Sequence, residues 1–230
     1  MKSFAKSVLL LVLLCLTVVA VPVSAEDCFD DAQAAFDDGD YEGAIDLFTC
    51  AIEDDPENYE AYLGRANSYL LTGSLNVQTI IDYDYVYNND VQVIEDSIDD
   101  LSNQIDDDPE QVEPYILRAF ANYQLGDYEA VVDDTDQILD IDDEVAVAYL
   151  LRATANQYLG ETGDVEDDVA QAFDLDPDNP ALHEIIALAY LNTGEYELAV
   201  ENYDVAIEQI DDDAYYYLQR GWAQFFAGDA

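Results

Sequence analysis

Six glycines are spaced so regularly along the chain that they constrain its fold more than any other feature. Consecutive glycines are 34 residues apart, except for one interval of 53 residues, which is one period plus 19 residues. They are Gly39, Gly73, Gly126, Gly160, Gly194 and Gly228. A glycine that follows a helix adopts the left-handed backbone conformation easily and lets the chain reverse within a few residues. The spacing therefore predicts stacked helical hairpins, one of which contains an insertion.

Other positions keep the same register as these glycines. The residue seven positions before each glycine is small, as it must be where the two helices of a hairpin approach closely: Ala32, Ala66, Ala119, Ala153, Ala187 and Gly221. In the second half of the first repeat, Ala44, Phe48 and Ala51 follow at steps of three and four, which indicates one buried stripe on a helix. Three repeats end at a proline, which blocks further helix: Pro56, Pro109 and Pro177.

With these positions in one register, the chain resembles the tetratricopeptide-repeat (TPR) family over nearly all of residues 26–230. The resemblance implies an all-α, right-handed superhelical solenoid of about 5.5 helix-turn-helix repeats. The repeats are 25–58, 59–111 with the insertion, 112–145, 146–179, 180–213 and a partial 214–230. The chain departs from the family in having Cys, Tyr or His where Trp is preferred, and alanine in place of the first glycine. The resemblance also implies a non-enzymatic scaffold for protein interaction or assembly.

In TPR proteins the inner face of the first helix of each repeat is the usual peptide-binding groove. Carrying these positions over places the following residues there: Leu63, Asn67, Leu70, Ile116, Phe120, Tyr123, Leu150, Thr154, Gln157, Leu188 and Leu191. The set is apolar with a few amides, and it lacks the lysine and arginine clamp with which some TPR proteins hold acidic chaperone tails. A basic, neutral or aromatic-rich protein or peptide is the expected ligand. The alternative is that many of these residues are buried between repeats and bind nothing.

The insertion, residues 74–92, alternates tyrosine with aspartate. This pattern predicts either a short extended segment or a prolongation of the helices around the turn. A tolerated surface loop is one interpretation of the insertion. The other is a contact element built on Tyr83, Tyr85 and Tyr87, since exposed tyrosines are favoured in recognition surfaces.

Residues 1–25 have the pattern of a signal peptide, with Lys2 and Lys6 before an apolar run over 8–21 and a small residue at Ala25. Cleavage before Glu26 predicts a secreted protein, or one on the exterior of the cell envelope, without membrane insertion. The alternative is an uncleaved anchor. Cys28 and Cys50 remain after cleavage, on the two facing helices of the first repeat, and they form either a disulfide or two unpaired core residues.

The chain is strongly acidic, with 53 Asp and Glu against 6 Lys and Arg. Such a surface repels phosphate backbones and anionic lipids, which argues against nucleic-acid and membrane-surface partners. Acids cluster where the second helix of a repeat ends, for example over 53–55 and 106–108. These clusters suggest loosely bound calcium or monovalent cations, or simply a solvated acidic face. The sequence offers no dedicated metal site.

An enzyme is not expected, because the only histidine is His183 and every lysine lies in the signal peptide. No catalytic residue and no cofactor are therefore assigned. The four arginines share one register position, which predicts ion pairs with acids of the second helix, such as Asp133 near Arg118. They are Arg65, Arg118, Arg152 and Arg220.

The last helix, over 214–227, is aromatic, with Trp222, Phe225 and Phe226. Terminal repeats usually present a polar outer face. Three explanations stay open: the natural chain continues, a lone capping helix packs there, or copies of the chain assemble head to tail through this end. The functional alternatives to a scaffold are accordingly a self-assembling extracellular surface or fibre subunit and a cation-binding accessory protein.

Overall fold

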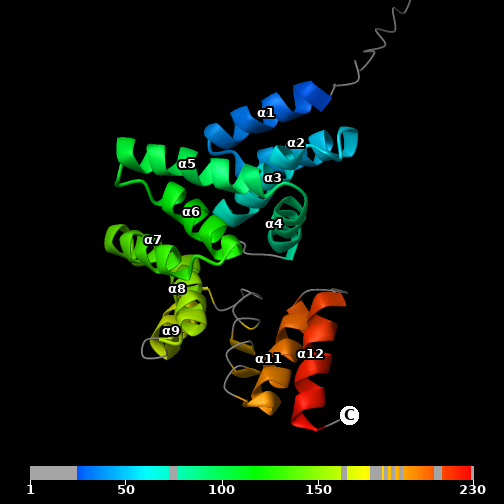
Figure 1. Cartoon of the computed structure of the whole chain (residues 1–230), viewed down its shortest axis with the longest axis vertical. Coiled ribbons are helices and arrows are strands. Elements are labelled where there is room, and N and C mark those ends of the chain that lie inside the picture. Colours follow the sequence, from blue (N-terminus) through cyan, green and yellow to red (C-terminus); the bar gives the residue numbers. More distant parts are fainter. Residues whose placement is uncertain are drawn as a thin grey trace, which may run out of the picture.

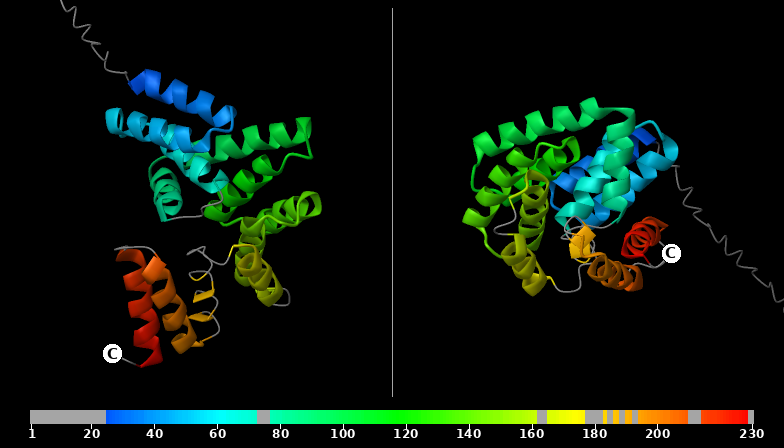
Figure 2. Two further views of the ribbon diagram at one scale, coloured as in Figure 1. Left: turned by 180° about the vertical axis from the view of Figure 1, so that it is seen from behind. Right: turned by 60° about the horizontal axis from the view of Figure 1, so that its bottom comes forward.

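A computed structural model describes residues 25–72, 77–161, 165–176, 183, 186–187, 190–191, 194–209 and 214–228. Every regular element among these residues is an α-helix. The helices are α1 (Ala25–Asp37), α2 (Tyr41–Asp54), α3 (Tyr59–Leu71), α4 (Val77–Asn89), α5 (Val91–Asp107), α6 (Val112–Leu125), α7 (Tyr128–Ile141), α8 (Ala146–Leu159), α9 (Val165–Leu175), α11 (Tyr196–Gln209) and α12 (Ala214–Ala227). They form a curved array that runs from α1 at the top of Figure 1 to α12 at the bottom, and its curvature is visible in Figure 2. The predicted all-α solenoid is thus confirmed.

The turn between α6 and α7 shows why the sequence Gly-Asp-Tyr repeats. Gly126 has φ 80° and ψ 16°, in the left-handed region, and its N–H donates to the carbonyl of Tyr123. The N–H of Asp127 reaches back to the carbonyl of Asn122 at 2.9 Å, which completes the helix end. The Asp127 carboxylate then accepts from the N–H of Ala130 at 3.2 Å and caps α7. Gly73 lies outside the described residues.

The core lies between paired helices, and its largest cluster of buried residues continues from α3 to α8. The small residues predicted at the closest approach are fully buried at Ala32, Ala66, Ala119, Ala153 and Ala187. Phe48 on α2 packs against α3 at Gly64, where a Cβ would lie 2.3 Å from the ring. Glycine at this position therefore permits the contact.

The insertion is helical, so the predicted extended segment and surface loop are wrong; the alternative of helical structure around the turn is the one observed, as a helix of its own. Residues 77–89 form α4, which packs along α3 in the place expected for the second helix of that repeat, while α5 packs mainly along α6. Four α4 residues at helical spacing are fully buried: Thr79, Asp82, Tyr83 and Val86. The second repeat therefore contains three helices.

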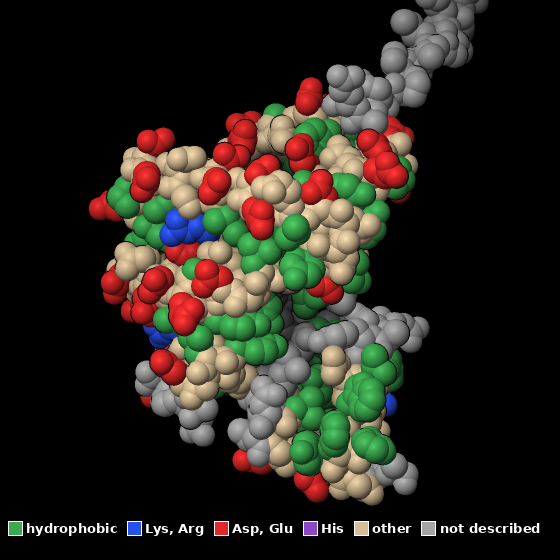
Figure 3. Space-filling view, viewed as in Figure 1, with side chains coloured by type: hydrophobic (Ala, Val, Ile, Leu, Met, Phe, Trp, Pro, Cys, Tyr) green, Lys and Arg blue, Asp and Glu red, His purple; other side chains and the backbone are tan. Residues whose placement is uncertain are grey.

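Acidic side chains are spread over the face shown in Figure 3 around the first seven helices. No described helix has a basic residue in its last turn, so the predicted clusters at helix ends are uncompensated locally. In the part of the chain that the structure describes, no helix is both long enough and apolar enough to span a membrane. The predicted signal peptide lies outside the described residues, apart from Ala25, with which α1 begins.

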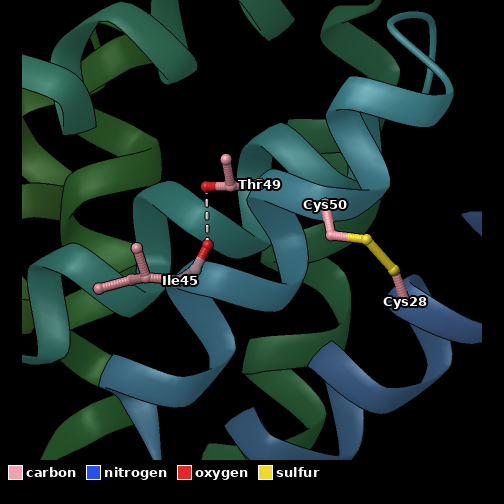
Figure 4. The surroundings of a disulfide bond; sticks show 4 residues. All are labelled: Cys28, Ile45, Thr49 and Cys50. Atoms are coloured by element: carbon pink, nitrogen blue, oxygen red, sulfur yellow. Dashed lines mark hydrogen bonds between the residues drawn. A yellow bond between two sulfur atoms is a disulfide. The ribbon is translucent and has the colours of Figure 1, made fainter. Parts of the chain in front are cut away.

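Cys28 and Cys50, whose pairing the sequence left open, form a disulfide that joins α1 to α2 (Figure 4). Their Cα atoms are 6.0 Å apart, and Cys28 is buried. Thr49, which immediately precedes Cys50 on α2, donates to the carbonyl of Ile45 one turn earlier at 2.8 Å. The disulfide thus holds the two helices of the first hairpin together.

Candidate functional site

A groove of about 510 Å³ lies between the first helices of the solenoid and α5. Its apolar part is formed by Phe36, Phe48, Val93, Leu63, Leu101 and Leu117. Four exposed carboxylates line it as well, on Asp37, Glu60, Asp96 and Asp100. Gln33, Asn67, Ser97 and Gln104 add amide and hydroxyl groups. An apolar surface with acids around it suits a segment that carries both apolar and basic side chains.

The insertion shapes this groove. Because α4 takes the place beside α3, α5 is free to form the second wall, and it supplies residues from Val93 to Gln104 along more than two helical turns. Tyr83 of α4 donates its hydroxyl to Oδ1 of Asn67 at 2.5 Å. Burial raises the pKa of Tyr83, so the phenol stays protonated and keeps donating. With its oxygen engaged, Asn67 offers a ligand its NH₂ group as a hydrogen-bond donor.

The predicted contact tyrosines of the insertion have different environments. Tyr83 is fully buried and packs on Phe120 with ring centroids 4.8 Å apart, so its prediction as a contact residue is wrong. Tyr85 is half-buried against Tyr62, at 4.5 Å between centroids. Tyr87 is 46% exposed. Of the three, only Tyr87 is exposed.

Most residues predicted to line the inner face are packed into the core. Seven are buried: Leu63, Asn67, Leu70, Ile116, Phe120, Leu150 and Thr154. Tyr123, Gln157 and Leu191 are half-buried, and Leu188 lies outside the described residues. Only Leu63 and Asn67 line the groove described above. The prediction of an eleven-residue binding surface is therefore wrong for the buried residues outside the groove, because adjacent helices cover them.

A second feature is a set of arginines that clamp three successive helices together. The Nε and Nη2 atoms of Arg118 donate to both carboxylate oxygens of Asp134, at 3.0 and 2.6 Å. Its Nη1 donates to Ser102 of the preceding helix at 2.9 Å, and its guanidinium lies 5.8 Å from the ring of Tyr115. The predicted partner, Asp133, is wrong by one residue, since Asp133 points to solvent.

Arg65 and Arg152 repeat this arrangement. Arg65 holds Asp82 through Nε and Nη2, both at 2.8 Å, and Arg152 holds Asp168 at 2.9 and 2.6 Å. Their Nη1 atoms reach back to Thr49 and Asp136. Each clamp thus ties the first helix of a repeat to its own second helix and to the helix before it. Bidentate, charge-assisted contacts of this kind are among the strongest hydrogen bonds in proteins.

The comparisons with known proteins decide the family. The sequence profile described as Tetratricopeptide repeat matches residues 29–76 and 144–214, which is more than half of the chain. The chain belongs to the tetratricopeptide-repeat family. Members of this family generally act as protein-interaction scaffolds. No curated protein sequence matches the chain.

Solved TPR structures show the same fold. TTC0263, a thermophilic TPR protein of Thermus thermophilus, is 19% identical, with a TM-score of 0.52, and the match covers 88% of this chain and 100% of that one. A TPR protein of Parabacteroides merdae is also 19% identical, with a TM-score of 0.51 over 89% of this chain and 87% of its own. At these identities the similarity establishes the fold alone.

Two further groups in the described part of this TPR chain, the histidine and one cluster of potential metal ligands, have structural partners. Nδ1 of His183 lies 3.3 Å from Oδ1 of Asn202, and its ring packs edge-on against Phe173. One described group of three side chains is close enough to hold a metal ion, Cys28, Cys50 and Asp54. Two of its members are joined in the disulfide, and a disulfide sulfur is not a thiolate ligand.

Proposed function

We propose that this TPR protein is an exported scaffold that holds a partner protein through the groove between α1, α3 and α5. The ligand segment is one with aliphatic or aromatic side chains next to lysine or arginine. The observation that carries the proposal is the combination of apolar surface and four carboxylates in one groove. Apolar anchors supply most of the affinity, and the acids select for basic neighbours.

Two features support export. Residues 1–25 have the signal-peptide pattern. The Cys28–Cys50 disulfide suits an oxidising compartment, because such bonds are rare in cytosolic proteins. Edman sequencing of the protein recovered from its native medium should begin at Glu26; an intact residue 1 in that fraction would contradict export by this route.

The groove is tested by selecting short random peptides on the immobilised protein. We expect the selected peptides to combine lysine or arginine with apolar residues. The double variant Asp96→Lys/Asp100→Lys should weaken their binding at least about ten-fold, since it places positive charge beside a positive ligand.

A matched control lies on the same helix. Glu95 and Asp99 are exposed on α5 but do not line the groove. Glu95→Lys/Asp99→Lys makes the same change in net charge and should retain binding to within about two-fold, as expected for surface positions away from the site. Equal losses in the two double variants would show that overall charge, rather than the groove, attracts the peptides.

A further inference from the structure

Arginine and aspartate occur as a pair in the repeats of this chain. Where the first helix carries the arginine, a buried aspartate follows 16 or 17 residues later, at Asp82, Asp134 and Asp168. Two repeats lack the arginine, with Asp31 and Ile186 in its place, and there the later position is Leu47 or Asn202. In these repeats the arginine thus occurs together with an aspartate whose carboxylate accepts its hydrogen bonds.

Arg220 on α12 is the fourth arginine, and its clamp is half formed. Its Nη1 donates to Asp204 of the preceding helix α11 at 2.7 Å, and its guanidinium lies 5.3 Å from the ring of Tyr217. These contacts match those of the other three arginines. Its Nε, which in the others binds the aspartate, is buried and has no hydrogen-bond partner among the described residues. A buried donor left unpaired costs free energy that a carboxylate would recover.

The surface around Arg220 is open where the other repeats are covered. A Cβ added to Gly221 would contact nothing within 4 Å, whereas the equivalent Ala119 is fully buried. Leu218 and Trp222 are 59% and 51% exposed, against 8% and 1% for the equivalent Ile116 and Phe120. Hydrophobic side chains gather on this part of the molecule in Figure 3, where Figure 1 places α12. The face has the shape and chemistry of a repeat without its second helix.

We infer that this face of α12 is a docking site for an amphipathic helix of a partner protein that presents an aspartate to Arg220. The chain's own aspartate-bearing helices indicate the sequence of that helix. Each has a β-branched residue three positions before the aspartate and an aliphatic residue four positions after it, all buried: Thr79 and Val86, Val131 and Ile138, Val165 and Ala172. The partner helix therefore carries this spacing of β-branched residue, aspartate and aliphatic residue.

The clamp aspartates of a second copy of the chain are not free to meet this requirement. Asp82, Asp134 and Asp168 are each at most 3% exposed and already bound to an arginine of their own repeat. Another copy would have to open a repeat to supply one of them. The occupant is accordingly a helix outside these three closed clamps, and this site is separate from the groove at the other end of the array.

The test uses a peptide of residues 127–141 as the probe, since α7 already satisfies the pattern. The exposed acids that follow its N-cap residue Asp127 are changed to glutamine (Glu129→Gln, Asp133→Gln, Asp136→Gln and Asp140→Gln) so that it is repelled less by the acidic protein. The control peptide carries Asp134→Asn in addition. Fluorescence anisotropy should show that the control binds at least about ten-fold more weakly, because it cannot form the charged bidentate contact.

Three protein variants locate the binding. Arg220→Gln should lose the preference for the aspartate peptide. Gly221→Leu fills the open position and should abolish binding without lowering the melting temperature, which separates blockage from misfolding. Asp96→Lys/Asp100→Lys should bind the probe normally, so failure of the groove proposal leaves this one intact. Equal affinity for the two peptides, or unchanged binding by Gly221→Leu, would overturn the inference, as would self-association of the wild type that competes with the probe.

Discussion

Each complete arginine clamp places a nearly buried carboxylate against a partly buried guanidinium. The side chains of Asp134 and Arg118 are 4% and 23% exposed. Breaking such a pair is costly, because the remaining charge has lost both its partner and its water. Burial raises the pKa of Asp134, and the neighbouring Arg118 opposes that rise. The pair therefore decides the ionisation of Asp134 as well as the packing of α6 on α7.

Replacing the arginine should give a loss of stability that depends on pH. Arg118→Leu is expected to cost about 3 kcal/mol near neutral pH, since it leaves Asp134 charged and buried. Without Arg118 the pKa of Asp134 rises further above its unfolded value. A group with a raised pKa loses stability as pH rises through that pKa, so the penalty shrinks again as pH falls. Urea unfolding of wild type and variant at about pH 7 and about pH 5 measures this difference.

The neighbouring residue provides the control for the same experiment. Asp133 is exposed on α7, so Asp133→Asn should change the free energy of unfolding by less than about 0.5 kcal/mol at either pH. If Arg118→Leu lost the same stability at both pH values, Asp134 would not be the group left uncompensated.

Helix α4 is where sequence reasoning and structure differ most. The alternation of tyrosine and aspartate over 82–87 left an extended segment and prolonged helices open, whereas Thr79, Asp82, Tyr83 and Val86 have the spacing of a helical stripe. A pattern of apolar residues alone does not show this stripe, because one of its buried members is polar. Asp82 is buried as the partner of Arg65, so it belongs to the inner face of the helix. The hairpins, in contrast, could be predicted from single residue types. The glycines mark left-handed turns, and the alanines mark positions where two helices approach closely.

The groove was harder to predict for a related reason. Leu63 and Asn67 follow from the repeat register, since they lie on the first helix of a repeat. Asp96 and Asp100 cannot be predicted from this register. They line the groove because α4, rather than α5, packs along α3. The burial of Phe120 and Leu150 likewise depends on neighbouring helices, which a single repeat pattern does not contain.

The disulfide should contribute most of its stability to the α1–α2 hairpin. It closes a loop across a sequence separation of 22 residues, for which loop-closure entropy gives about 3 kcal/mol. The double variant Cys28→Ala/Cys50→Ala should lower the melting temperature and reduce hydrogen-exchange protection in α1 more than in α7. Reducing agent should affect the wild type and leave the variant unchanged. Equal loss of protection in both helices would contradict a local role for the bond.

Across the whole molecule the net charge of −47 opposes the compact state. The cost is concentrated where acids follow one another at helix ends, as with Asp106 and Asp107 of α5, because they oppose the helix dipole as well as each other. In the described parts of the chain, no three carboxylates lie close enough to share one ion. Screening by many loosely held cations is expected to relieve this repulsion.

Thermal melts in increasing sodium chloride should show this relief as a rise in melting temperature. Several helix ends, each relieved of roughly 0.3 to 1 kcal/mol, correspond to a shift on the order of 5 °C for a chain of this size. Calcium chloride at the same ionic strength should raise the melting temperature no further than sodium chloride does, because screening depends on ionic strength, whereas a calcium site would add binding free energy to the folded state. A larger rise in calcium would place an ion-binding site among the acidic helix ends. A melting temperature insensitive to both salts would show that these acids are simply solvated and cost the fold nothing.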